Sequence, residues 1–175
     1  MIHILLYSGG VESILCLKML RDKGITPFLF HFRTKKLKPK HEKMIRRTAK
    51  LLSPKSPLYI FETKTDDYLA SYSTNGEYHV HLNKRGTTMM MQKYGDVIIV
   101  GYTGYDSMDG RRKLRTHFHG SGFLKRQFLF PLLGKRKSKI SNLFKQLSDE
   151  VRQNTVSSTK FYRGDWAVVH PITKT

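Results

Sequence analysis

The feature that most constrains the fold is a pair of glycines between two different hydrophobic patterns. The stretch YSGGVES, residues 7–13, follows the apolar run HILLY and precedes the helical spacing of Ile14, Leu17 and Leu20. A short apolar run is typical of a strand covered on both faces, and adjacent glycines allow a tight turn. The first part of the chain therefore predicts a strand, a glycine turn and a helix.

Strands and helices are predicted to alternate along the rest of the chain. Such alternation implies parallel crossovers, so we expect a doubly wound α/β fold with a mainly parallel, five-stranded sheet and helices on both faces. The predicted strands are His3–Tyr7, Thr26–Phe32, Pro57–Glu62, Asp96–Gly101 and Gln127–Leu133. The predicted helices are one ended by Gly24, one over Met44–Leu52, one around Thr87–Tyr94 and one over Ser138–Val151.

The length of the chain fits one domain. A chain of 175 residues can bury a core without disulfides. We expect a single domain over residues 1–175, with a basic irregular insertion at about 102–126 and an irregular tail from about residue 155. The one cysteine, Cys16, cannot form an internal disulfide, and no apolar stretch is long enough to span a membrane. Without the features of a signal peptide, the sequence predicts a cytoplasmic protein that does not bind a membrane.

Positive charge is the strongest signal in the composition. The chain has 32 Lys and Arg against 13 Asp and Glu, a formal net charge of +19, concentrated in residues 33–50 and 111–139. Such an imbalance destabilises a compact chain by self-repulsion unless an anionic partner compensates it. A solvated basic surface is one interpretation; the density of the two clusters favours the other, an RNA or DNA interface. The residues predicted to bind nucleic acid are Arg111, Arg112, Lys113, Arg115, Lys125 and Arg126.

The glycine turn has the composition of a phosphate site. In a parallel sheet, ligands bind at the carboxyl ends of the strands, and the first strand-to-helix turn is the usual place for phosphate. Gly9 and Gly10 allow backbone N–H groups to approach an anion, while Ser8 and Ser13 add hydroxyl donors. The spacing is neither that of the dinucleotide-binding glycines nor that of the Walker loop. A tight turn without a ligand is the alternative interpretation.

The segment SGGVES, residues 8–13, resembles the Ser-Gly-Gly-x-Asp-Ser signature of the PP-loop (N-type) ATP pyrophosphatases. These enzymes cleave ATP between the α and β phosphates while they adenylate a substrate. Further segments are similar to the 7-cyano-7-deazaguanine synthase branch, which serves queuosine biosynthesis, and the resemblance covers roughly residues 1–160. The matching residues are Phe32, Arg33, Glu42, Gly101, Asp106, Asp109, Pro131, Leu132, Lys137, Ile140 and the stretch TVSST, residues 155–159.

The resemblance implies an adenine nucleotide alpha hydrolase-like fold that binds ATP and Mg²⁺. The residues that it implies for ATP are Ser8, Gly9, Gly10, Glu12, Ser13, Arg33 and Gly101. It implies catalytic roles for Lys137 and Asp106, and places Mg²⁺ on Glu12 and Asp106.

Three departures from the pattern leave two hypotheses open. Glu12 stands in place of Asp, Lys139 in place of Glu, and Ser158 in place of the first of four zinc-binding cysteines, so zinc is not expected. The first hypothesis is an enzyme that adenylates a 7-deazaguanine acid or a base in nucleic acid. The second is a catalytically degenerate PP-loop fold that acts as a basic nucleic-acid-binding or assembly subunit. With either hypothesis we expect a homo-oligomer or a partner chain that completes the site.

Overall fold

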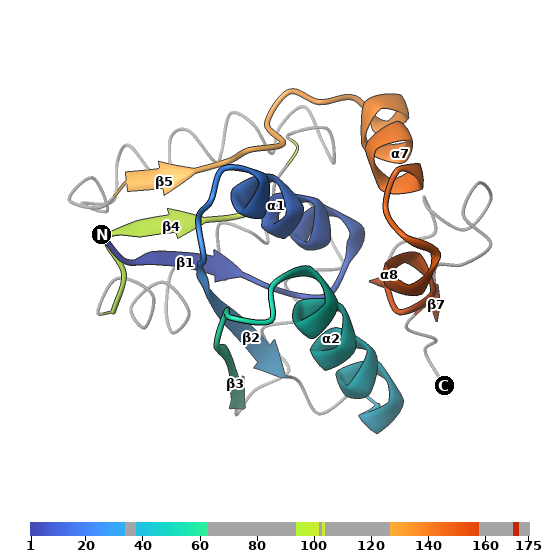
Figure 1. Ribbon diagram of the computed structural model, residues 1–175, viewed down its shortest axis with the longest axis horizontal. Helices are drawn as coiled ribbons and strands as arrows, with labels where there is room; N and C mark the ends of the chain where they lie inside the picture. Colours follow the sequence, from blue (N-terminus) through green and yellow to red (C-terminus); the bar gives the residue numbers. More distant parts are fainter. Residues whose placement is uncertain (34–37, 63–93, 102, 104–126, 158–169, 172–175) are drawn as a thin grey trace, which may run out of the picture.

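The computed structural model describes residues 1–33, 38–62, 94–101, 103, 127–157 and 170–171. Its centre is a five-stranded, fully parallel sheet with the strand order β3-β2-β1-β4-β5 (Figure 1). The strands are β1 His3–Leu6, β2 Phe28–Arg33, β3 Leu58–Glu62, β4 Val97–Ile99 and β5 Gln127–Leu129. All five predicted strands are present, so the predicted parallel α/β architecture is confirmed. The fifth is shorter than predicted, because a turn begins at Pro131.

Every helix in the described part of the chain packs on the same face of the sheet. The helices are α1 Val11–Asp22, α2 Pro39–Leu52, α7 Lys137–Lys145 and α8 Asp149–Gln153. Their apolar side chains share one core with Leu5, Leu29 and Ile99 of the strands. α1 contacts both α2 and α7 and lies between them (Figure 1). The helix that follows the glycine turn is therefore the central helix of this layer.

The opposite face of the sheet carries a second apolar cluster. Phe30, Phe32 and Ile98 are buried there, and the Phe32 ring stacks on Phe61 with the ring centroids 5.2 Å apart. Most of the chain between β3 and β4 and between β4 and β5 lies outside the described residues, as do the predicted basic insertion and most of the helix predicted around Thr87–Tyr94.

The C-terminus of α1 confirms the role predicted for Gly24. Gly24 has a φ of +73°, and its N–H donates to the Arg21 carbonyl at 2.9 Å. The N–H of Ile25 donates to the Leu20 carbonyl at 2.9 Å. These two bonds form a Schellman motif, in which the left-handed backbone favours glycine.

The prediction of one helix over Ser138–Val151 is wrong. α7 ends at Lys145, and α8 begins after Ser148, whose Oγ accepts a hydrogen bond from the Val151 N–H at 3.4 Å. This cap and the two acidic residues of the first turn stabilise a new helix N-terminus. The apolar spacing nevertheless continues across the break because Leu147 stays buried, and that spacing alone predicted a single helix.

The tail, predicted to be irregular from about residue 155, contains a small sheet of its own. β6 Val156–Ser157 pairs in parallel with β7 His170–Pro171. No helix among the described residues is both long enough and apolar enough to pass through a bilayer.

Replacing Gly24 tests the assignment of the helix end. We expect Gly24→Ala to lower the free energy of unfolding by about 1–2 kcal/mol, because alanine resists a positive φ. Gly24→Asn should lower it less, since asparagine tolerates the left-handed region. No atom lies within 4 Å of the Cβ position, so steric overlap does not contribute. Equal stability of all three proteins in urea unfolding would contradict the assignment.

Candidate functional site

The glycine turn lies where the sheet changes direction. From β1 the chain first builds β2 and β3 on one side, and later β4 and β5 on the other. In open α/β sheets, ligands bind beyond the carboxyl ends of the strands at such a switch point. The loop Ser8–Gly10 leaves the carboxyl end of β1, and Gly101 follows β4, the neighbouring strand.

Gly101 packs directly on the first turn of α1. A Cβ on Gly101 would lie 2.9 Å from the Glu12 carbonyl carbon and 3.0 Å from the Glu12 Cβ. No room therefore exists for a side chain between the end of β4 and the start of α1. The structure brings these two predicted residues together at the switch point.

Gly9 is fixed by contacts on the inner side of the loop. Its φ is +74°, and an added Cβ would lie 2.5 Å from Ile45 Cγ1 and 3.3 Å from Val156 Cγ2. The Val156 N–H also donates to the Gly9 carbonyl at 3.0 Å. Both the backbone conformation and the available space therefore require glycine. Ile45 belongs to α2 and Val156 to β6, so two elements distant in sequence hold the loop.

The outer side of the loop carries its polar groups in a closed ring of hydrogen bonds. The Gly10 N–H donates to Ser8 Oγ at 3.2 Å, and Ser13 Oγ donates to the Gly10 carbonyl at 3.0 Å. The two hydroxyl oxygens are 3.2 Å apart, so the Ser8 hydroxyl closes the ring by donating to Ser13 Oγ. Ser8 is exposed, and Gly10 has no side chain that could cap α1.

This arrangement can bind an anion. An exposed hydroxyl and an amide lie at the N-terminus of a helix, where the partial positive charge of the helix dipole attracts phosphate. An incoming phosphate oxygen would replace Ser8 Oγ as the acceptor for the Gly10 N–H. Glu12 lies beside the loop, with Oε2 4.0 Å from the position that a Cβ on Gly10 would occupy.

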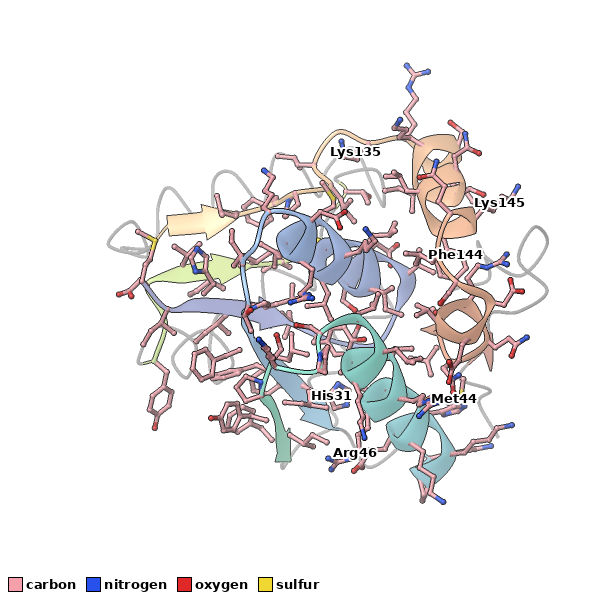
Figure 2. The ribbon with its side chains drawn as sticks, viewed as in Figure 1. His31, Met44, Arg46, Lys135, Phe144 and Lys145 are labelled. Atoms are coloured by element: carbon pink, nitrogen blue, oxygen red, sulfur yellow. The ribbon has the colours of Figure 1, made fainter. Side chains whose placement is uncertain are left out.

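Three buried polar residues, Tyr7, His31 and Thr48, support the loop through hydrogen bonds on its inner side. The sequence did not predict this role. His31 Nδ1 lies 2.9 Å from the carbonyl oxygen of Tyr7, the residue before Ser8. The Tyr7 hydroxyl lies 2.6 Å from Thr48 Oγ1, which donates to the Ile45 carbonyl at 3.1 Å. His31 is a residue of β2, and its side chain extends toward α2 (Figure 2).

Burial keeps the Tyr7 phenol neutral. Desolvation raises the pKa of Tyr7 well above its usual range, and the hydrogen bond with Thr48, which lowers it, is the smaller effect. The phenol is therefore neutral at pH 7 and can donate its hydrogen bond to Thr48 Oγ1. A polar residue inside an apolar pattern needs a buried partner, and this was the available signal for Tyr7, His31 and Thr48.

The structure describes only some of the other predicted site residues. Arg33 is the last residue of β2, at the carboxyl end of the sheet where the loop lies. Lys137 is the first residue of α7 and is exposed, and α7 packs against α1. Among the residues that the structure describes, no group of three His, Cys, Asp or Glu side chains could hold a metal ion. The predicted residues outside the described ranges are Asp106, Arg111, Arg112, Lys113, Arg115, Lys125 and Arg126.

Comparison with known proteins establishes the fold. No family model matches the chain, and no curated protein matches it significantly. A predicted subunit of a tRNA methyltransferase from Methanocaldococcus jannaschii has a TM-score of 0.61 at 16% identity, over 83% of this chain and 75% of that one. The fold is adenine nucleotide alpha hydrolase-like. NMN synthetase from Francisella tularensis shares this fold with a TM-score of 0.52 at 14% identity, over 82% of this chain but only 60% of that one.

The two glycines of the loop should differ sharply in their tolerance of alanine. Gly9→Ala should lower the free energy of unfolding by about 2–5 kcal/mol, from the positive φ and the overlap with Ile45. Gly10→Ala, at a φ of −80° and with only the mobile Ser8 hydroxyl within 3.4 Å, should change it by less than about 1 kcal/mol. Thermal unfolding of both variants measures the difference, and equal effects would contradict the loop geometry.

Proposed function

We propose that this chain is an ATP-binding PP-loop protein that adenylates its substrate and releases pyrophosphate. The observation that carries the proposal is the loop Ser8–Gly10. It combines a glycine in the left-handed conformation, an amide and two hydroxyls at a helix N-terminus, and a position at the switch point of the sheet. The adenine nucleotide alpha hydrolase-like fold and the SGGVES segment support ATP as the ligand.

In this proposal the loop binds the β and γ phosphates of ATP. The Gly10 N–H and the hydroxyls of Ser8 and Ser13 donate to phosphate oxygens, and the α1 N-terminus faces their charge. A carboxylate or amide oxygen of the substrate attacks the α phosphorus, the bond to the bridging oxygen breaks, and pyrophosphate leaves. A nitrogen nucleophile then attacks the adenylated carbon, and AMP leaves. The protein contributes positioning and charge stabilisation rather than covalent chemistry.

Charged residues around the loop have proposed roles in this reaction. Mg²⁺ would supply charge neutralisation on the phosphate oxygens, and the Glu12 carboxylate beside the loop suits this hard cation, with Asp106 as the second proposed ligand. Arg33, at the carboxyl end of β2, and Lys137, at the start of α7, are the proposed cations for the phosphates or the adenylate. Gly101 leaves space for the close approach of β4 to the loop helix.

The proposed substrate is a 7-deazaguanine acid or a base within nucleic acid. Similarity to the 7-cyano-7-deazaguanine synthase branch supports the first, and the net charge of +19 supports the second. The Methanocaldococcus protein with the same fold is described as a tRNA methyltransferase subunit, which supports both an RNA substrate and a partner chain or second copy that completes the site.

A second candidate function is a degenerate PP-loop fold that binds nucleic acid without using ATP. The hydrogen-bond ring favours it, because the Gly10 N–H and both serine hydroxyls already have partners within the loop. A phosphate that binds here must displace part of the ring. Glu12, which stands where the family signature has Asp, is consistent with this degenerate fold.

The production of AMP and pyrophosphate from ATP tests the proposal. With Mg²⁺ and either RNA or a 7-deazaguanine acid present, the native protein should form both products. Ser8→Ala should lower kcat/KM about tenfold to hundredfold, since a hydrogen bond to a charged group contributes about 1.5–3 kcal/mol. Ser8 is exposed and its two loop hydrogen bonds are long, at 3.2 Å, so its loss should lower the free energy of unfolding by less than about 1 kcal/mol. Thr26→Ala, an exposed hydroxyl at the other edge of the sheet, is the matched control.

The same assay separates the two candidates. A protein that binds labelled RNA with a steep dependence on salt, yet neither binds nor cleaves ATP, would contradict the enzyme and support the degenerate fold.

A further inference from the structure

α2 presents a strongly cationic face to solvent. Its opposite face packs into the core through Met44, Ile45 and Ala49, which are at most 7% exposed. No large apolar side chain of α2 is fully exposed. The exposed cations of the helix are Lys40, Lys43, Arg46, Arg47 and Lys50.

Four of these cations form one stripe along the helix, which we call the α2 stripe: Lys40, Lys43, Arg47 and Lys50. At about 100° per residue, their Cα atoms fall within about 80° of the helix circumference. With a rise of about 1.5 Å per residue, the stripe is about 15 Å long.

Little negative charge compensates the α2 stripe. Arg47 pairs with Glu150 of α8, and Arg46, beside the stripe, pairs with Glu42 at 2.9 Å. Within the described ranges, Lys40, Lys43 and Lys50 form no ion pair with a carboxylate. Like charges at neighbouring positions of a helix repel one another, so a polyanion that lies along the stripe relieves this repulsion.

We propose that the α2 stripe binds the phosphodiester backbone of RNA. Lysines spaced along a helix contact successive phosphates as point charges without reading the sequence. A membrane surface is disfavoured because the apolar face of α2 packs into the core, so the helix has no exposed large apolar side chain to insert into lipid. A protein partner is disfavoured because lysine is depleted in protein–protein interfaces.

The α2 stripe begins at the end of the sheet where the carboxyl ends of the strands meet, which is also where the loop Ser8–Gly10 lies. The chain enters α1 and α2 at the edge toward which the strand arrows point (Figure 1). Lys40 lies in the first turn of α2, nearest this edge, and Lys50 lies in the last turn. RNA held along the stripe would extend toward the loop, so that one base could reach the adenylation site. The choice of RNA over DNA rests on the proposed function, whereas phosphate binding by the stripe does not.

Fluorescence anisotropy with a labelled RNA hairpin, without ATP and at several salt concentrations, tests the inference. We expect Lys40→Gln/Lys43→Gln to weaken binding at least tenfold and to reduce the slope of log K against log[salt] by about 2, because each lysine neutralises about one phosphate. Lys23→Gln/Lys55→Gln removes the same charge from two exposed lysines that follow the C-terminal ends of α1 and α2, and should bind like the native protein. Circular dichroism verifies that all three proteins are folded.

Each other outcome has a defined meaning. Equal weakening in both double variants would overturn the inference, because net charge alone would then explain the binding. A DNA duplex bound as tightly as RNA, or anionic vesicles bound with the same dependence on Lys40 and Lys43, would also overturn it. ATP binding is measured in parallel by calorimetry. If no protein binds ATP but only the stripe variant loses RNA affinity, the proposed function fails and the α2 stripe stands.

Discussion

The left-handed backbone of Gly9, enclosed by Ile45 and Val156, is the constraint on which the rest of the site depends. It sets the direction in which the chain turns from β1 into α1, and so the direction of the Gly10 N–H and of the helix N-terminus. A methyl group at this position would overlap Ile45, so any larger residue would force the loop or α2 to move. Packing fixes the inner side of the turn, and the outer side presents the Ser8 hydroxyl and the Gly10 N–H.

The supports of this loop come from distant parts of the chain. β2 contributes His31, α2 contributes Thr48 and Ile45, and β6 contributes the Val156 N–H. Buried polar groups that are hydrogen-bonded rigidify a structure, whereas unpaired ones destabilise it. In the proposed function, a phosphate oxygen would replace Ser8 Oγ as the acceptor for the Gly10 N–H, and the backbone of the loop would stay in place because the supports hold it.

Local patterns in the sequence predicted the strands and the glycine turn, but not the distant residues that support the loop. The apolar runs predicted all five strands, and the glycine pair predicted the position of the turn, because both signals act over a few residues. The contacts of Val156 and His31 with the loop join residues far apart in sequence, and no local pattern encodes them. The break between α7 and α8 was missed because the apolar spacing continues through it. Asp106 and the basic residues from Arg111 to Arg126 stay predictions.

The sharpest test of the loop's role is an NMR titration of the ¹⁵N-labelled protein with ATP and Mg²⁺, followed at the backbone amides. If the loop binds the terminal phosphates, the Gly9, Gly10 and Ser13 amides should show the largest shift changes, with saturation, and pyrophosphate should reproduce them. Shift changes that spread over the lysines of α2 and leave the glycine amides unmoved would contradict phosphate binding by the loop.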